Sequence, residues 1–371
     1  MKKIVIIGGG AAGYFTAINA KESNPDLEVT ILEKGKEVLQ KVKISGGGRC
    51  NVTHACFEPK ELVKFYPRGE KELLGPFHQF MTGDTFEWFD DRGVPLKIEG
   101  DNRVFPEANT SQAIIDCFQK SVDTLGIKVL TNHGVNTVTK QDDTWSIHTK
   151  EQVFEADQLV IAAGSSKKVW ELCETLDHAV VAPVPSLFTF NINDKRLVDL
   201  LGTSVPNATV TISGTKLEAS GPLLITHWGM SGPAVLKLSA FGARILADKH
   251  YQYNVEVNWL SRPTDKVLNV LLNLKKKEPR KTVILKSPFT EVSRRLWERF
   301  VLFSDISKTQ NWADLNNAQL EKLANQLTKG IYNANGRTTF KEEFVTAGGV
   351  DLKEINFKRF ESRKHNNLFF V

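Results

Sequence analysis

The first 33 residues combine a strand, a glycine turn, a helix and a second strand in an order that few folds accommodate. Residues 2–7 are a short β-branched run, residues 8–13 have the pattern G-x-G-x-x-G, and small and apolar residues at helical spacing follow. A second strand, residues 28–33, ends in an acid, Glu33. A glycine turn between strand and helix, with an acid about twenty residues further on, is the fingerprint of a dinucleotide-binding βαβ unit.

Each part of this fingerprint has a physical task. Gly8 makes the tight turn, Gly10 leaves room for a pyrophosphate, and Gly13 lets the helix pack closely on the strand. The helix N-terminus offers free N–H groups and a partial positive charge to phosphates. Glu33 can accept hydrogen bonds from ribose hydroxyls and would repel a 2′-phosphate. We therefore predict an adenine-dinucleotide site; the alternative is a glycine turn that only packs. The predicted site residues here are Gly8, Gly10, Ala11, Ala12, Gly13 and Glu33.

A second glycine-rich stretch covers residues 45–53, Ser-Gly-Gly-Gly-Arg-Cys-Asn-Val-Thr. Three consecutive glycines cannot form a stable helix or strand interior, so we predict a loop whose backbone approaches the pyrophosphate. Arg49 and Asn51 would supply polar groups to the ligand. The alternative is a flexible surface turn.

The pattern of the remaining chain predicts one α/β domain that is interrupted by an insertion. Residues 127–130 and 157–164 read as further buried strands, and the second of these ends in small residues, Ala163 and Gly164. Residues 135–156 alternate as a three-stranded meander. The predicted order is the α/β domain over 1–185, an all-strand stretch over 186–260, a helical stretch over 261–335, and a return to the α/β domain over 336–371.

Composition excludes several classes of protein. In 371 residues no apolar run approaches the length of a membrane span, and the four cysteines form no C-x-x-C pair. The N-terminus runs directly into a strand, so we expect no signal peptide and a cytoplasmic protein. We predict no metal site. The net charge of +5 permits an anionic substrate or nucleic acid without requiring either.

Five motifs in this order suggest a known family: the glycine turn at 8–13, the loop at 46–51, and the segments 103–106, 226–233 and 345–350. Together they resemble the bacterial FAD-binding oxidoreductases of the aminoacetone-oxidase type, also called BaiN-like flavoproteins. The resemblance implies a glutathione-reductase-like FAD-binding Rossmann domain with an inserted β-barrel and a helical subdomain. It implies that Val135 touches the adenine side through its backbone. The further FAD contacts expected on this basis are Lys34, Gly48, Arg49, Cys50, Asn51, Ala163 and Gly164.

The sequence departs from this family in two places. The strand before the insertion ends in Ala163-Gly164-Ser165, where members often carry Thr-Gly-Gly, and the sequence stops at Val371. Family members continue into a Gly-Glu segment and a last helix that hold the flavin end of FAD. We therefore expect the ADP half of FAD to find its site and the flavin half to be weakly held, with little bound flavin and slow turnover.

The expected function is that of an FAD-dependent oxidoreductase with an unassigned substrate. Only one G-x-G-x-x-G occurs in a strand–turn–helix context, so NADH or NADPH would reduce the flavin by docking transiently. A small amine, ketone or steroid-like enone is one class of substrate. Two alternatives stay open: a reductase acting on a uridine in ribosomal RNA, and a non-catalytic dinucleotide-binding protein. The sequence does not indicate an oligomeric state.

Two residues are candidates for catalysis. Cys50 has Arg49 and His54 nearby in sequence, and such neighbours could lower the pKa of its thiol; the alternative is a small packing residue beside the cofactor. His227 lies in a loop bounded by glycines and prolines and could act as a proton donor, since histidine titrates near neutral pH. A structural histidine is the alternative.

Overall fold

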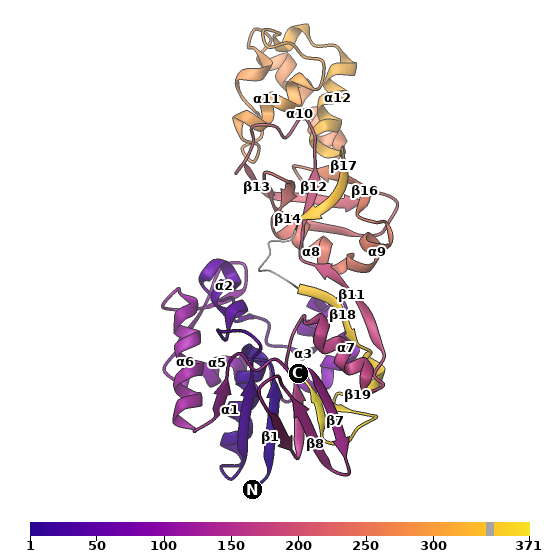
Figure 1. Cartoon of the computed structure of the whole chain (residues 1–371). Helices are drawn as coiled ribbons and strands as arrows, with labels where there is room; N and C mark the ends of the chain where they lie inside the picture. Colours follow the sequence, from indigo (N-terminus) through magenta and orange to yellow (C-terminus); the bar gives the residue numbers. More distant parts are fainter. Residues whose placement is uncertain (339–344) are drawn as a thin grey trace. The chain divides into compact units, whose positions relative to one another are not determined.

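The computed structural model describes residues 1–338 and 345–371, and the chain divides into two compact units (Figure 1). The α/β unit comprises Met1–Pro183 and Gly348–Val371, and the barrel unit comprises Val184–Ala347. Residues 339–344, which fall within the predicted return to the α/β domain over 336–371, lie outside the described residues.

A seven-stranded sheet forms the centre of the α/β unit. β1 (Lys3–Ile7) pairs in parallel with β2 (Glu28–Leu32) on one side and β10 (Gln158–Ile161) on the other. The parallel part of the sheet is completed by β6 (Lys128–Leu130) beside β2 and β21 (Leu368–Phe370) beside β10. Two short antiparallel strands, β20 (Glu361–Ser362) and β19 (Ile355–Asn356), extend the edge beyond β21. The predicted parallel strands are confirmed.

Alternate residues of β1 enter two different cores, because successive strand side chains point to opposite faces. Ile4 and Ile6 pack with α1 (Ala11–Ser23) and α6 (Ser111–Thr124) on one face. Val5 and Ile7 pack on the other face with α7 (Lys167–Thr175) and the predicted meander. The meander strands are β7 (Thr137–Gln141), β8 (Thr144–His148) and β9 (Val153–Ala156). Both faces are therefore covered, as a buried parallel sheet requires.

The segment between β2 and α6 forms a smaller layer. α2 (Gln40–Gly48) departs from helical geometry at Ser45, Gly46 and Gly47, with φ of 57° and 69° at the two glycines, so the predicted glycine loop begins inside this element. The remaining elements here are β3 (Thr53–His54), α3 (Pro59–Leu62), η1 (Val63–Phe65), α4 (Glu70–Phe77), α5 (Thr82–Asp90), β4 (Leu96–Ile98) and β5 (Arg103–Pro106).

The barrel unit contains a closed six-stranded barrel and a helical subdomain. The barrel strands, in spatial order, are β12 (Thr189–Ile192), β15 (Gly229–Ser231), β14 (Glu218–Ile225), β13 (Ser204–Ile212), β16 (Gln252–Asn258) and β17 (Gly330–Thr338). The helices of this unit are α8 (Pro233–Phe241), α9 (Ala243–Asp248), α10 (Thr264–Lys277), η2 (Val283–Leu285), α11 (Arg294–Leu302), η3 (Trp312–Asp314) and α12 (Asn317–Thr328). The described barrel and helices share one continuous hydrophobic core.

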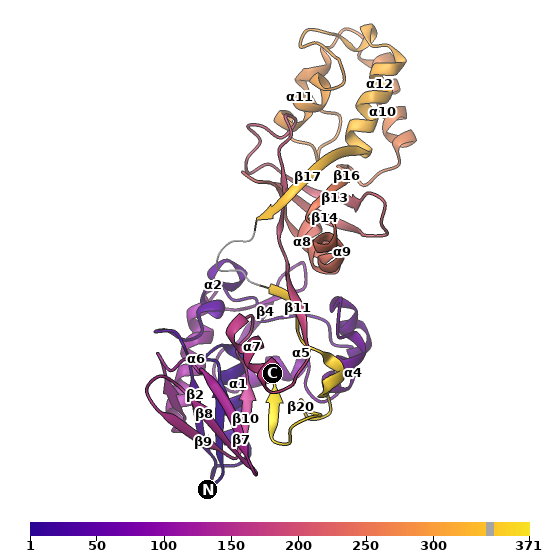
Figure 2. The same cartoon turned by 45° about the vertical axis from the view of Figure 1, so that its right-hand side comes forward.

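The boundary predicted at residues 335 and 336 needs correction. β17 pairs with β12 and β16 and closes the barrel, so residues 330–338 belong to the barrel. Local sequence could not show this, because both partners of β17 lie more than 70 residues earlier in the chain. β11 (Val180–Ser186) and β18 (Val345–Val350) pair with each other where the chain passes between the units (Figure 2).

A buried histidine joins the C-terminal strands to the rest of the α/β unit. The Nδ1 atom of His178 lies 2.7 Å from Glu354 at the end of η4 (Leu352–Glu354), and its Nε2 atom lies 3.0 Å from the hydroxyl of Ser362. That hydroxyl accepts the N–H groups of Lys364 and His365, each at 3.0 Å. It therefore donates to Nε2, and the neutral imidazole carries its proton on Nδ1 toward Glu354.

This arrangement predicts that acid weakens the C-terminal edge of the sheet. Burial lowers the pKa of His178, although Glu354 opposes the shift and His365 and Lys364 add to it. A histidine with a lowered folded-state pKa stabilises the fold above its usual pKa of about 6.5, and the contribution is lost as pH falls below that value. We expect the opening free energy of the β10–β21 hydrogen bonds, measured by hydrogen exchange, to fall as pH decreases below about 6.5, by at most about 1.4 kcal/mol per pH unit.

His178→Gln removes the titrating group and should abolish most of this slope. His148→Gln, at the end of β8, serves as the matched control and should leave the slope in place. An unchanged slope in His178→Gln would mean that other groups cause the acid dependence.

Candidate functional site

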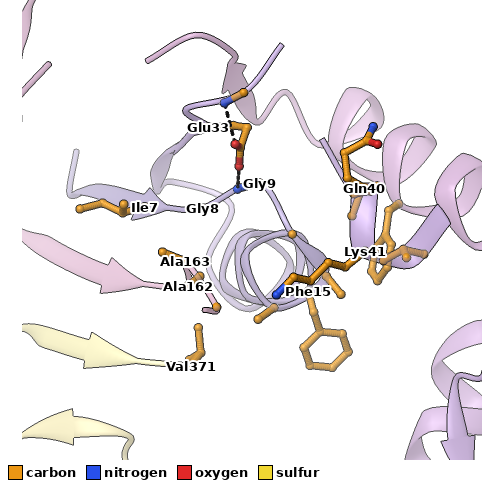
Figure 3. A pocket seen from close by; sticks show the side chains of 18 of the residues that line it. Ile7, Gly8, Gly9, Phe15, Glu33, Gln40, Lys41, Ala162, Ala163 and Val371 are labelled. Atoms are coloured by element: carbon orange, nitrogen blue, oxygen red, sulfur yellow. Dashed lines mark hydrogen bonds between the residues drawn. The ribbon is translucent and has the colours of Figure 1, made fainter. Parts of the chain in front are cut away.

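A cavity of about 1070 Å³ opens at the carboxyl ends of the parallel strands (Figure 3). Ile7 at the end of β1, Glu33 after β2, Ala163 after β10 and Val371 after β21 all line it. Ligands of open α/β sheets bind at this edge. The volume is slightly above the usual range for ligand pockets, roughly 300–1,000 Å³, so a molecule of dinucleotide size fits.

The glycine turn gives the cavity an open anion cradle. A β-carbon on Gly8 would lie 2.4 Å from the carbonyl oxygen of Ala162, and one on Gly13 would lie 2.0 Å from the carbonyl oxygen of Gly8. Neither position admits a side chain. A β-carbon on Gly10 would meet nothing within 4 Å, so that position leaves space beside the turn. The predicted roles of these three glycines agree with this geometry.

The N-terminus of α1 faces this space. The first hydrogen bond of the helix runs from the Tyr14 N–H to the Gly10 carbonyl oxygen, at 3.1 Å. The N–H groups of Ala11 and Ala12 therefore precede the helical bonds, and both residues line the cavity. The first turn contains no acidic residue, so its partial positive charge is available to a phosphate.

Glu33 is held in place by the backbone on both sides of it. One carboxylate oxygen accepts the Gly9 N–H at 2.8 Å, and the other accepts the Gly35 N–H at 2.7 Å (Figure 3). A carboxylate has about four acceptor positions, so two backbone bonds leave capacity for two ribose hydroxyls. The carboxylate is thus oriented before a ligand arrives.

The structure brings most of the predicted cofactor residues together around the cavity. Those that line it are Gly8, Gly10, Ala11, Ala12, Glu33, Lys34, Cys50, Asn51, Val135, Ala163 and Gly164. Gly13, Gly48 and Arg49 are not among its lining residues. Gly13 acts through the close packing described above.

Arg49 is not among the residues that line the cavity, and its contact with the cofactor stays a prediction. Its guanidinium donates to Glu99 at 2.6 Å and to Asn109 at 3.2 Å, and it lies over the ring of Phe105 at 3.9 Å. Arg49 thus attaches the glycine loop to the small sheet beside it. Glu99 is 50 residues further along the chain, so the sequence motif alone could not reveal this partner.

The expectation of a lowered pKa for the Cys50 thiol is wrong. Burial raises the pKa of Cys50, and a contact with Ser45 only partly opposes the shift. Arg49 is engaged with Glu99, and the ring of His54 packs on Phe65 at 4.4 Å. A buried neutral thiol on the cavity wall agrees with the alternative interpretation of Cys50, a small residue that packs beside the cofactor. The other three cysteines are also free thiols.

His227 belongs to the barrel unit, in the turn between β14 and β15, and its side chain is exposed. Its role as a proton donor stays a prediction. Sequence reasoning missed several polar residues of the cavity wall, among them Gln40, Lys41 and Lys168. The first two lie on a helical stretch whose apolar spacing gives no sign of a neighbouring ligand site.

The described parts of the chain contain no group of three or more His, Cys, Asp or Glu side chains that could hold a metal ion. In the same residues, 1–338 and 345–371, no helix is long and apolar enough to cross a membrane.

Comparison with known families gives a match over nearly the whole chain. The model of the HI0933-like protein Rossmann domain family matches residues 2–371. The chain belongs to this family. The assignment supports a Rossmann-type FAD-binding domain and, more broadly, a flavin-dependent oxidoreductase. It is wider than the aminoacetone-oxidase type that the motifs resemble.

Three curated relatives align with almost all of the chain. The ribosomal RNA dihydrouridine synthase of Haemophilus influenzae is 25% identical, and the alignment covers 99% of this chain and 90% of that protein. The protein of the same name from Escherichia coli is 26% identical, with the same coverage. The 3-dehydro-bile acid delta(4,6)-reductase of Clostridium scindens is 24% identical, over 100% of this chain and 92% of that protein.

The position of Glu33 predicts that its substitution weakens the binding of FAD. Glu33→Ala removes the predicted ribose acceptor and leaves the N–H groups of Gly9 and Gly35 without their partner. We expect FAD binding to weaken by about 1–3 kcal/mol, measured by titration of FAD fluorescence. Glu28→Ala, at the opposite end of β2, is the matched control and should bind FAD like the unmodified protein. Equal affinities for both variants would show that Glu33 has no part in binding.

Proposed function

We propose that this chain is an FAD-dependent reductase whose flavin receives its electrons from NADH or NADPH. The observation that carries the proposal is the cavity itself, in which the glycine turn, the end of α1 and Glu33 meet at one edge of the sheet. These groups match the diphosphate and ribose of an adenine dinucleotide in charge and in hydrogen bonding. The family match over the whole chain supports the same cofactor.

FAD, when bound, supplies the hydride-transfer chemistry, and the chain supplies binding, orientation and exclusion of water. Glu33 would hold the ribose, and the N–H groups of Ala11 and Ala12 would hold the diphosphate. The cavity wall includes an aromatic cluster, in which the ring of Trp88 lies 5.1 Å from that of Phe15 and 5.6 Å from that of Phe118. Such a wall excludes water from a bound ring system.

The proposal predicts a flavin that responds to reduced nicotinamide. The protein, purified or reconstituted with FAD, should show a flavin absorbance band that bleaches when NADH or NADPH is added without oxygen. The same additions to free FAD under identical conditions are the control. A protein that takes up no FAD would contradict the proposal and favour the alternative of a dinucleotide binder without turnover.

The charge of the helical subdomain favours ribosomal RNA as the substrate. Residues 261–329 carry fourteen Lys and Arg against seven Asp and Glu, an excess larger than the +5 of the whole chain. Lys276, Lys277 and Arg280 are exposed at and just after the end of α10. A cationic surface of this kind attracts the phosphate backbone of nucleic acids. The names of two relatives point to the same substrate class.

We infer that the reaction is the reduction of a ring carbon–carbon double bond. The relatives' printed names, dihydrouridine synthase and delta(4,6)-reductase, both describe the addition of hydrogen to a ring. A uracil base in RNA and a small cyclic enone are therefore the two substrates to compare. The charge excess favours the first.

Binding of ribosomal RNA should depend steeply on salt. For a single strand, the log–log slope is about −0.7 for each phosphate neutralised. Replacing Lys276, Lys277 and Arg280 with alanine should reduce the magnitude of the slope by about 2, measured by filter binding or fluorescence anisotropy over a salt series.

The control variant removes three exposed lysines of the α/β unit instead: Lys60, Lys71 and Lys120. This variant should keep the slope of the unmodified protein. RNA binding that is undetectable or independent of salt would exclude RNA and leave the small cyclic enone as the substrate class.

A further inference from the structure

Arg337 of β17 differs from the other half-buried arginines of the chain. None of the described residues forms a hydrogen bond or an ion pair with its guanidinium, and its buried Nε atom has no hydrogen-bond partner among them. Every other described arginine that is buried or half-buried donates to a carboxylate or to a backbone carbonyl oxygen: Arg49, Arg92, Arg196, Arg244 and Arg299. A partly desolvated guanidinium without such a partner costs folding free energy.

A β-bulge turns Arg337 toward the inner face of the barrel. In β17, Ala334 is buried and Asn335 is exposed, so strict alternation would place residue 337 outside. The register with β12 shifts here, because Ile192 pairs with Ala334 while Phe190 pairs with Arg337. Two residues of β17 thus oppose one of β12, which is how a bulge re-aims the side chains that follow it. Opposed residues share a face, and Phe190 belongs to the barrel core.

Tyr251, which directly precedes β16, lies against the guanidinium. The Cζ atom of Arg337 is 4.6 Å from the centre of the Tyr251 ring. Gly336 in the bulge, with φ of 98°, donates its N–H to the Tyr251 carbonyl oxygen at 2.8 Å. His250 and Tyr251 have φ of 51° and 58°, which is uncommon for residues with a side chain. The same bulge therefore directs Arg337 and holds the ring on which it lies.

A second polar atom without a partner lies close by. Four aromatic rings contact one another in series, with centres between 5.3 and 6.0 Å apart, and form what we call the barrel-end cluster: Tyr251, Phe188, Phe190 and Tyr253. Tyr253 is 7% exposed, and its hydroxyl and the Nε atom of Arg337 are the two buried side-chain polar atoms without a partner in the described residues. Buried polar groups are normally hydrogen-bonded. Both exceptions occur at this end of the barrel, so a partner from outside the described chain is indicated here.

We propose that Arg337 binds a backbone phosphate of the substrate RNA, with Tyr251 as its platform. The inference rests on the RNA substrate proposed above and names a residue that contacts it. A guanidinium that lies on an aromatic ring keeps its N–H groups at its edge, where they match pairs of phosphate oxygens. The neighbouring Phe190 is fully buried, and in such apolar surroundings the attraction is stronger than in water. A carboxylate on a small substrate offers the same chemistry, so the experiment includes one.

The test is the salt dependence of binding to a short, fluorescently labelled oligouridylate. We expect Arg337→Met to reduce the magnitude of the log–log slope by about 0.7, the value for one phosphate of a single strand. Over a salt range from about 1 M to about 0.05 M, this difference amounts to a roughly eightfold loss of affinity at the lower salt. Arg337→Lys keeps the charge and should keep the slope. An oligouridylate with neutral methylphosphonate linkages should bind Arg337→Met and the unmodified protein equally well.

Two control variants separate the charge of Arg337 from packing and from general electrostatics. Tyr253→Phe removes the other polar atom that lacks a partner, without a change of charge, and should keep the slope. Lys120→Gln removes an exposed charge of the α/β unit and should keep it too. Arg337→Met should melt at the same temperature as the unmodified protein or higher, because it removes a half-buried charge without a partner. An arginine with only a structural role would lower the melting temperature when replaced.

The outcomes separate this inference from the proposed function. If the unmodified protein binds no oligouridylate, the RNA substrate and the role of Arg337 are both wrong, whereas FAD binding and its reduction are judged by the flavin absorbance. If RNA binds and Arg337→Met keeps the full slope, only the role of Arg337 is overturned. Equal losses for the charged and the methylphosphonate oligomer would overturn it as well. A loss of affinity for the carboxylate of cholate, with an unchanged RNA slope, would assign Arg337 to a small anionic substrate instead of RNA.

Discussion

The close approach of α1 to β1 is the constraint on which the site depends. A β-carbon on Gly13 would lie 2.0 Å from the Gly8 carbonyl oxygen, and one on Gly8 would lie 2.4 Å from the carbonyl oxygen of Ala162. Glycine at both positions lets the helix begin directly above the ends of β1 and β10. The N–H groups of Ala11 and Ala12 consequently face the cavity. Any side chain at Gly8 or Gly13 would push the helix away and remove the cradle.

The other walls of the cavity are attached to the same turn. Glu33 bonds to the Gly9 N–H, and Leu39 at the start of α2 bonds to the Gly9 carbonyl oxygen. Gly9 thus positions both Glu33, the predicted ribose acceptor, and the start of α2. Because these links use the backbone, the cavity is organised before a ligand binds, and less ordering is left for the binding step.

The cavity and the excess of positive charge lie in different units. The described α/β unit contains the complete cavity, and the barrel unit contains the excess of positive charge. In the barrel unit, one hydrophobic core runs from the barrel into the helical subdomain. Under the proposed function, the α/β unit would hold FAD and the barrel unit would contact the phosphates of the RNA substrate. His227 lies in the barrel unit, and its part in catalysis stays a prediction.

Local sequence determined the elements that depend on interactions between residues close together in the chain. These are the strand–turn–helix start, the acid after β2, the parallel strands and the meander. Their spacing and glycines act on neighbouring atoms, so the sequence shows them directly. Tertiary structure alone decided the contacts between distant segments. It turned Arg49 toward Glu99, buried Cys50 so that its pKa rises, placed residues 330–338 in the barrel, and brought Lys41 to the loop after β10. For Arg49, residues 330–338 and Lys41, the partner lies 50 or more residues away in the chain; for Cys50, the cause is burial. Neither a distant partner nor burial by distant segments produces a periodic pattern in the sequence from which it could be predicted.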